Sequence, residues 1–292
     1  MNNLTIKNIT KQYANGVNAL NKASLELNNG LFGLLGPNGA GKSSLMRTIA
    51  TLQEPTSGTV SFNGVDCIQN PQVLRSQLGY LPQEFGVYPK VNAEDLLHHL
   101  AVLKGVVSKG ERKDQVNALL EQTNLYNHRK KSVNTFSGGM RQRFGIAQAL
   151  LGAPKLIIVD EPTAGLDPEE RNRFLNLLSE IGENVIIILS THLVEDVRDL
   201  CNKMAILNKG RIVVQGNPID LTETLLNKTW VKTIAKSEIE IYQENYHVLS
   251  TRLLSGKTQI QILSEENPGN NFNIYKPDLE SVYFSYLNPI LK

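Results

Sequence analysis

The stretch "GLFGLLGPNGAGKSSLMRTIATL", residues 30–52, decides the fold. A short apolar run, 30–35, leads into a glycine-rich loop, and the residues from 42 onward follow a helical pattern. The loop, "GPNGAGKS" at 36–43, matches G-x-x-x-x-G-K-[ST], in which backbone N–H groups curl around an anion at a helix N-terminus. A strand, an anion-holding loop and a helix in this order predict an α/β fold.

The side chains of this loop add nucleotide chemistry. Lys42 can reach the β- and γ-phosphates of a nucleotide, and Ser43 offers a hydroxyl to Mg²⁺. A glycine-rich turn that matches by chance is the alternative, and the strand–helix context argues against it. We therefore expect a nucleotide to be held by Gly36, Pro37, Asn38, Gly39, Ala40, Gly41, Lys42, Ser43 and Ser44.

Two later apolar runs are typical of strands that are covered on both faces of a parallel sheet, "LIIVDEP" at 156–162 and "VIIIL" at 185–189. The first ends in two carboxylates, at the sheet edge where open parallel sheets bind ligands. Asp160 is predicted to hold Mg²⁺ through water. Glu161 is predicted to orient and polarise the water that attacks the γ-phosphate. A buried strand with an acidic end is the alternative.

Two further polar residues follow predicted strands. His192 ends "ILSTH" and is expected near the γ-phosphate, where it can hydrogen-bond the phosphate or the attacking water. Gln83 of "GYLPQ" carries an amide that both donates and accepts, so it can contact Mg²⁺ or the water when its loop swings in. A structural role is the alternative for the histidine.

A second phosphate-holding turn occurs at "FSGGMRQR", residues 136–143, where Ser137, Gly138 and Gly139 open a separate helix. One domain of this kind needs only one nucleotide cradle. The economical interpretation is that this turn contacts the γ-phosphate of a nucleotide held by a second protomer. Two subunits would then enclose two ATP molecules head to tail.

The ordered set of motifs resembles the ATP-binding subunit of an ABC transporter. The set consists of the phosphate loop, "LPQ" at 81–83, "SGG" at 137–139, "VDEP" at 159–162, "AGLD" at 164–167 and "STH" at 190–192. The resemblance covers about residues 1–220. It implies a P-loop NTPase core of the RecA-like type, an N-terminal antiparallel β subdomain and an inserted helical subdomain at about 84–150.

The same resemblance assigns further roles. Tyr13 would stack on adenine, and Asp167 would lie on the loop that communicates across the dimer. The segment "EFGVYP", 84–89, would lie near the surface that meets an integral membrane permease. Phe136 and Met140 depart from the usual Leu-Ser-Gly-Gly-Gln signature, but the serine and both glycines are kept.

Composition limits the partners. The 292 residues carry a net charge of +2, which gives no case for nucleic acid as a partner. Cys67 and Cys201 lie far apart without metal-ligand spacing, so we expect reduced thiols. Residues 1–13 lack the apolar region of a signal peptide, and no apolar run approaches the roughly 18 residues of a membrane span. We expect a cytoplasmic protein that reaches the inner face of the membrane through its permease.

The pattern changes near residue 220. Residues 229–243 and 247–263 alternate polar and apolar side chains, the second stretch turning at 255–256, and Asp278 is placed to cap a closing helix. The chain therefore divides into an ATPase domain, 1–220, and a small α+β appendage, 221–292.

The subgroup and two rival functions stay open. Residues 87–105 and 278–287 resemble bacterial exporters of the drug- and peptide-resistance kind, with a second ATPase protomer that is identical or a paralogue. A soluble ABC-type ATPase that acts on nucleic acid or ribosomes usually carries tandem domains or a coiled-coil insertion. A P-loop kinase or GTPase is disfavoured by the signature and by His192.

Overall fold

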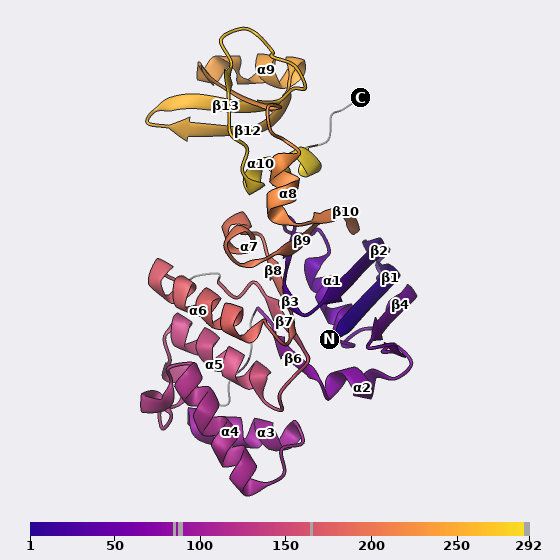
Figure 1. The fold of residues 1–292 in the computed structure, drawn as a ribbon, viewed down its shortest axis with the longest axis vertical. Coiled ribbons are helices and arrows are strands. Elements are labelled where there is room, and N and C mark those ends of the chain that lie inside the picture. Colours follow the sequence, from indigo (N-terminus) through magenta and orange to yellow (C-terminus); the bar gives the residue numbers. More distant parts are fainter. Residues whose placement is uncertain (84–85, 87–89, 164–165, 289–292) are drawn as a thin grey trace.

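The computed structural model describes residues 1–83, 86, 90–163 and 166–288 (Figure 1). At its centre lies a six-stranded sheet formed, in spatial order, by β10 (Arg211–Gly216), β9 (Lys203–Asn208), β3 (Gly30–Leu35), β8 (Ile186–Thr191), β7 (Leu156–Asp160) and β6 (Leu78–Leu81). All pairs are parallel except β9 with β10. Every residue of β7 and β8 is buried, so the prediction of a parallel sheet covered on both faces is confirmed.

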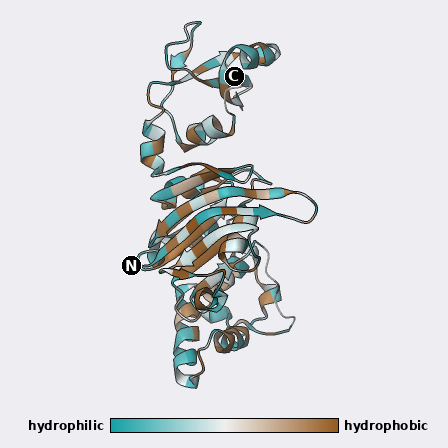
Figure 2. Ribbon diagram, turned by 90° about the vertical axis from the view of Figure 1, so that its right-hand side faces the viewer, coloured by the Kyte–Doolittle hydropathy of each residue, from teal (hydrophilic) through white to brown (hydrophobic). Residues whose placement is uncertain are grey.

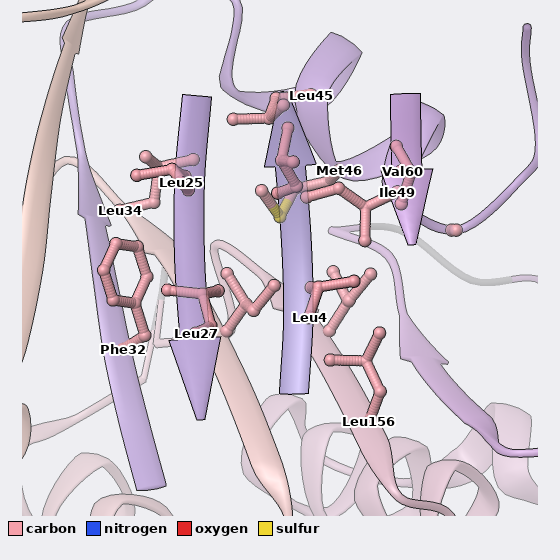
Figure 3. Close-up of a cluster of buried hydrophobic side chains, with 14 of the residues drawn as sticks. Leu4, Leu25, Leu27, Phe32, Leu34, Leu45, Met46, Ile49, Val60 and Leu156 are labelled. Atoms are coloured by element: carbon pink, nitrogen blue, oxygen red, sulfur yellow. The ribbon is translucent and has the colours of Figure 1, made fainter. Parts of the chain in front are cut away.

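A second, antiparallel sheet covers one side of this core. It consists of β2 (Asn18–Asn28), β1 (Asn3–Gln12), β4 (Ser57–Phe62) and β5 (Val65–Asp66). Hydrophobic and hydrophilic residues alternate along its strands (Figure 2). Helix α1 (Lys42–Ile49) packs into the same buried cluster as both sheets, and Leu45 and Met46 share this cluster with Leu4 and Phe32 (Figure 3). This packing fixes the helix that follows the phosphate loop.

The segment between β6 and β7 is helical. It contains α3 (Ala93–Leu103), α4 (Lys109–Gln122), the 3₁₀ turns η1 (Tyr126–His128) and η2 (Val133–Thr135), and α5 (Gly138–Leu150). Asn92 caps α3 by accepting a hydrogen bond from the backbone N–H of Asp95. Phe136 is buried and meets Phe144 edge to face, with ring centroids 6.3 Å apart. The phenylalanine that departs from the usual signature is therefore a core residue of the helical segment.

The other face of the parallel sheet is covered by α6 (Pro168–Ile181) and α7 (Val194–Leu200). In the chain, α2 (Pro71–Arg75) follows β5 of the antiparallel sheet and leads into β6 of the parallel sheet. Cys67 and Cys201 are both buried free thiols, and burial raises the pKa of Cys201 to about 12. Among the residues that the structure describes, no helix has the length and apolar character needed to cross a bilayer.

The C-terminal region forms a third sheet. After α8 (Pro218–Glu223), strands β12 (His247–Leu254), β13 (Lys257–Leu263), β11 (Thr229–Ile234) and β14 (Asn273–Ile274) lie in that order. The predicted turn at Ser255–Gly256 is confirmed, because both residues have positive φ between paired β12 and β13. The alternation over 229–243 proves to be a strand only as far as Ile234. It is followed by the 3₁₀ turn η3 (Lys236–Glu238) and helix α9 (Ile239–Asn245).

The last helix, α10 (Leu279–Leu287), returns to the buried cluster on the α6 and α7 side of the parallel sheet. Its predicted cap is confirmed, since Asp278 accepts a hydrogen bond from the backbone N–H of Ser281 at 2.8 Å. Val282 and Tyr283 are buried in the cluster that contains Val197 of α7. The C-terminal region is therefore attached to α7, the helix that follows β8 and His192.

Candidate functional site

The phosphate loop joins β3 to α1 at the carboxyl edge of the parallel sheet. Gly41 lies at the start of α1 with φ 108°, a conformation that favours glycine, and a Cβ there would stand 2.3 Å from the carbonyl oxygen of Ala19. A Cβ on Gly36 would stand 2.4 Å from the carbonyl oxygen of Leu207. The loop is therefore backed closely by two other strands, and its free side faces outward.

Lys42 is buried at the base of this loop. Its Nζ donates a hydrogen bond to the carbonyl oxygen of Gly36 at 2.7 Å and lies 3.3 Å from Oε1 of Glu161. The ammonium is thus held at the loop by a carbonyl and a carboxylate that face it from two different strand ends. A phosphate entering the loop would find a positive charge already in place.

The end of β7 carries the two predicted carboxylates. Glu161 has φ 50°, which is uncommon for a residue with a side chain, and its backbone N–H donates to the carbonyl oxygen of Ser190 at 2.8 Å. This turn aims the Glu161 side chain toward the phosphate loop. Asp160 is buried, and its Oδ1 has no hydrogen-bond partner among the described residues.

His192 follows β8 and meets Glu161. Its Nδ1 lies 2.6 Å from Oε2 of Glu161, while nearly half of the imidazole surface is exposed. One carboxylate therefore links the lysine of the phosphate loop with the histidine of the neighbouring strand. Sequence analysis predicted that Lys42, Glu161 and His192 act at the same phosphate group, and in the structure Glu161 contacts both of the other side chains.

An open cavity of about 410 Å³ lies over the loop, within the size range of small-ligand sites. Eleven of the site residues predicted from the sequence line this cavity. They are Tyr13, Pro37, Asn38, Gly39, Gly41, Lys42, Ser43, Ser44, Gln83, Glu161 and His192. Gly36, Ala40 and Asp160 do not line it and are buried. The structure thus brings together the residues predicted to hold the base, the phosphates and the water.

Sequence reasoning missed one wall of this cavity. Val17, at the end of the turn after β1, and Asn18 and Ala19, at the start of β2, also line it. These residue types carry no chemical signal, and only the pairing of β1 with β2 places them there. Tyr13 beside them donates its hydroxyl proton to Gln53 at 3.0 Å and lies at hydrogen-bond distance from Ser44.

The predicted Mg²⁺ ligands fit that ion. Ser43 and Gln83 offer hydroxyl and amide oxygens at the cavity, and Asp160 offers a buried carboxylate with an unpartnered oxygen. No group of three or more metal-ligating His, Cys, Asp or Glu side chains occurs within 1–83, 86, 90–163 and 166–288. Mg²⁺ held here would therefore take further oxygens from a nucleotide and from water.

The signature residues lie apart from the cavity. Ser137 caps α5 by accepting a hydrogen bond from the backbone N–H of Met140, and none of Ser137, Gly138 and Gly139 lines the cavity. A Cβ on Gly138 would meet nothing within 4 Å. The start of α5, where backbone N–H groups lack intrahelical partners, is therefore not part of the cavity over the phosphate loop of its own chain.

Asp167 caps α6, accepting a hydrogen bond from the backbone N–H of Glu170 at 2.8 Å, and it does not line the cavity. Of the segment 84–89, only Gly86 is among the described residues, so its predicted place beside a membrane partner lies outside them.

Comparison with known proteins places these features in a family. The family described as "ABC transporter" matches residues 20–164. "Probable multidrug ABC transporter ATP-binding protein YbhF" of Escherichia coli is 37% identical over 202 residues, which are 69% of this chain and 35% of that protein. This chain therefore spans about a third of the length of that curated relative.

Other relatives match along most of their length. "Uncharacterized ABC transporter ATP-binding protein YxlF" of Bacillus subtilis is 32% identical, over 88% of this chain and 84% of that protein. "Methionine import ATP-binding protein MetN 2" of Bacillus anthracis is 32% identical, over 81% and 73% respectively.

A solved structure agrees with the fold. It is described as "Dimeric structure of a post-hydrolysis state of the ATP-binding cassette MJ0796 bound to ADP and Pi". The likeness has a TM-score of 0.67 and 26% identity, and it covers 73% of this chain and 98% of the other.

Proposed function

This chain belongs to the ABC transporter family of ATP-binding proteins, and from that premise we propose that it hydrolyses MgATP to drive a separate membrane permease. The observation that carries the proposal is the cavity over the phosphate loop, where Lys42, Glu161 and His192 lie in contact. An aromatic ring, a phosphate loop and a carboxylate line one space, and these are the groups proposed to contact the base, the phosphates and the attacking water.

The chemical step follows from these positions. When a nucleotide enters, Lys42 exchanges its carbonyl and carboxylate partners for phosphate oxygens, which frees Glu161 to accept a hydrogen bond from water. His192 keeps the Glu161 carboxylate oriented through the 2.6 Å contact. Mg²⁺, when bound near Ser43 and Asp160, would neutralise charge on the phosphates.

The site is completed by a second protomer. The N–H groups that open α5 do not line the cavity of their own chain, and they would meet the γ-phosphate of a nucleotide held by the partner. The open space around Gly138 leaves room for that approach. The two half-sites of one chain therefore serve two different nucleotides.

Export is the direction that we propose. The support is the resemblance of residues 87–105 and 278–287 to drug- and peptide-resistance exporters, and the word "multidrug" in the name of YbhF. MetN 2, whose name says import, is similar at 32% identity.

Purification of the tagged chain from detergent-solubilised membranes of its own cells tests the partner. We expect it to bring down a polytopic membrane protein and to release phosphate from ATP without any acceptor molecule. The phosphate release should rise when that membrane protein is reconstituted with the chain. Recovery of RNA or ribosomes in place of a membrane protein would contradict the proposal.

Tyr13 provides a second test, of nucleotide binding. Replacing Tyr13 with alanine should weaken ATP binding about 10-fold, because stacking on a base contributes roughly 1–3 kcal/mol. Tyr13→Phe keeps the ring and loses only the hydroxyl contacts to Ser44 and Gln53, so binding should stay within about threefold. Titration with a fluorescent ATP analogue measures both. Equal losses for the two variants would show that the hydroxyl, not the ring, matters.

A further inference from the structure

A buried carboxylate outside the cavity connects the segments that carry the catalytic side chains. Asp196 of α7 is completely buried, and nothing in its own helix neutralises it. We propose that Asp196 and Arg171 form a positioning pair, which fixes Glu161 relative to His192 for hydrolysis. The inference rests on the proposed ATPase function and concerns residues that no family motif above includes.

Three side chains converge on this carboxylate. Arg171 donates from Nε to Oδ1 of Asp196 at 2.6 Å, and Thr163 donates from Oγ1 to Oδ2 at 2.6 Å. Thr191 donates from Oγ1 to Oδ2 at a longer 3.4 Å. A carboxylate removed from water is stable only when it is paired and hydrogen-bonded, so loss of the Arg171 partner would leave a buried charge uncompensated.

The donors belong to the chain segments next to the catalytic residues. Thr163 lies two residues after Glu161, and Thr191 lies directly before His192. Asp196 therefore holds the exits of β7 and β8 at one point, a few residues from the contact between Glu161 and His192. A shift of either exit would change the direction in which the Glu161 carboxylate points.

The backbone at Glu161 requires such support. Its φ of 50° is disfavoured for a residue with a side chain, and such a conformation persists only where neighbouring contacts enforce it. The carbonyl oxygen of Ser190 binds its N–H on one side. The Thr163–Asp196 hydrogen bond fixes the chain on the other side.

Helix α6 extends the connection to the signature turn. Arg171 lies in the first turn of α6, and the adjacent Glu170 forms an ion pair with Arg143 of α5 at 3.3 Å. The Glu170 carboxylate also packs directly under Gly139, where a Cβ would be 2.6 Å from its Oε2. One helical turn therefore contacts the start of α5 on one side and the Asp196 cluster on the other.

Asp196→Asn in the full chain tests the pair, because the amide keeps the shape and removes the charge. We expect kcat to fall about 10- to 100-fold, the scale on which small misplacements of catalytic groups act. The binding of a fluorescent ATP analogue and the KM should stay within twofold. Arg171→Lys keeps the charge and loses the planar donor, so it should lower kcat in the same way but less.

Glu195→Gln is the matched control. Glu195 lies next to Asp196 in α7 and also faces Arg171, at 3.5 Å, but two thirds of its side chain is exposed. Its substitution should leave kcat within twofold. An equal loss in this control would overturn the assignment to the buried carboxylate.

Asp196→Asn and Arg171→Lys also distinguish a positioning role from a role in stability alone. A merely structural pair predicts a lower melting temperature with an unchanged kcat for the folded protein, and that result would overturn the proposal. In a Glu161→Gln background, Asp196→Asn should change the residual rate less than twofold, because it acts through Glu161. A further tenfold loss there would also contradict it. If Asp196→Asn does not fold, the same measurements are made on Arg171→Lys. If the wild-type chain itself does not hydrolyse ATP, the proposed ATPase function is refuted and not the positioning pair.

Discussion

Replacing Glu161 with glutamine should lower ATP turnover by about 100- to 10,000-fold, the usual range for loss of a general base. The amide keeps the size of the side chain and can still contact His192 and Lys42, but it cannot draw a proton from water. ATP binding should therefore stay within about threefold of the parental protein. Single-turnover phosphate release measures the chemical step without interference from product release.

The same variant should accumulate a nucleotide-bound dimer. If hydrolysis breaks the shared phosphate contacts, blocking it leaves both protomers attached to two ATP molecules. Size-exclusion chromatography with MgATP should show the dimer for Glu161→Gln and a monomer when ATP is omitted. Turnover at the parental rate would show that another group orients the water, with His192 as the first candidate because it shares the site.

Much of this site could be predicted from the sequence because its chemistry lies in short continuous motifs. Glycines at 36, 39 and 41 dictate a loop that only one class of ligand needs. The carboxylates follow an apolar strand, and parallel strands end at the same sheet edge. The contact between Lys42 and Glu161 can therefore be predicted once the order of the strands within the sheet is known.

Long-range pairing determined what the sequence could not predict. The cluster around Asp196 joins residues 163, 171 and 191, and no sequence pattern links these three positions to one another or to residue 196. The wall at 17–19 depends on the register between β1 and β2. Helix α9 could not be predicted, because its sequence lies within a stretch that alternates polar and apolar residues. In the structure, Ile239 and Tyr242 pack on the third sheet with the spacing of a helix.

Replacing Gly138 with aspartate should lower turnover by about 100-fold or more, the scale for losing a preorganised phosphate contact. The fold should tolerate the change, because a Cβ at Gly138 meets nothing within 4 Å and an acidic residue suits a helix N-terminus. The new carboxylate would instead repel the γ-phosphate of the nucleotide held by the partner. Gly138→Ala is the control and should cost less than about fivefold, since it adds bulk without charge.

Mixing two inactive variants tests whether the two motifs act across the interface. Lys42→Ala disables the phosphate loop of its own chain, and Gly138→Asp disables the signature turn. In a head-to-tail dimer of one copy of each, one site carries both defects and the other carries none. Random pairing makes half of the dimers mixed, so an equimolar mixture should regain about a quarter of the parental phosphate release.

This mixing experiment distinguishes two arrangements that activity measurements on one variant alone do not distinguish. If Lys42 and Gly138 served the same nucleotide within one chain, each variant would spoil its own site and the mixture would stay inactive. Recovery requires that the lysine of one chain and the glycine turn of another complete a single site. The cavity of the isolated protomer, lined by Lys42 but not by Gly138, is the geometry from which that recovery follows.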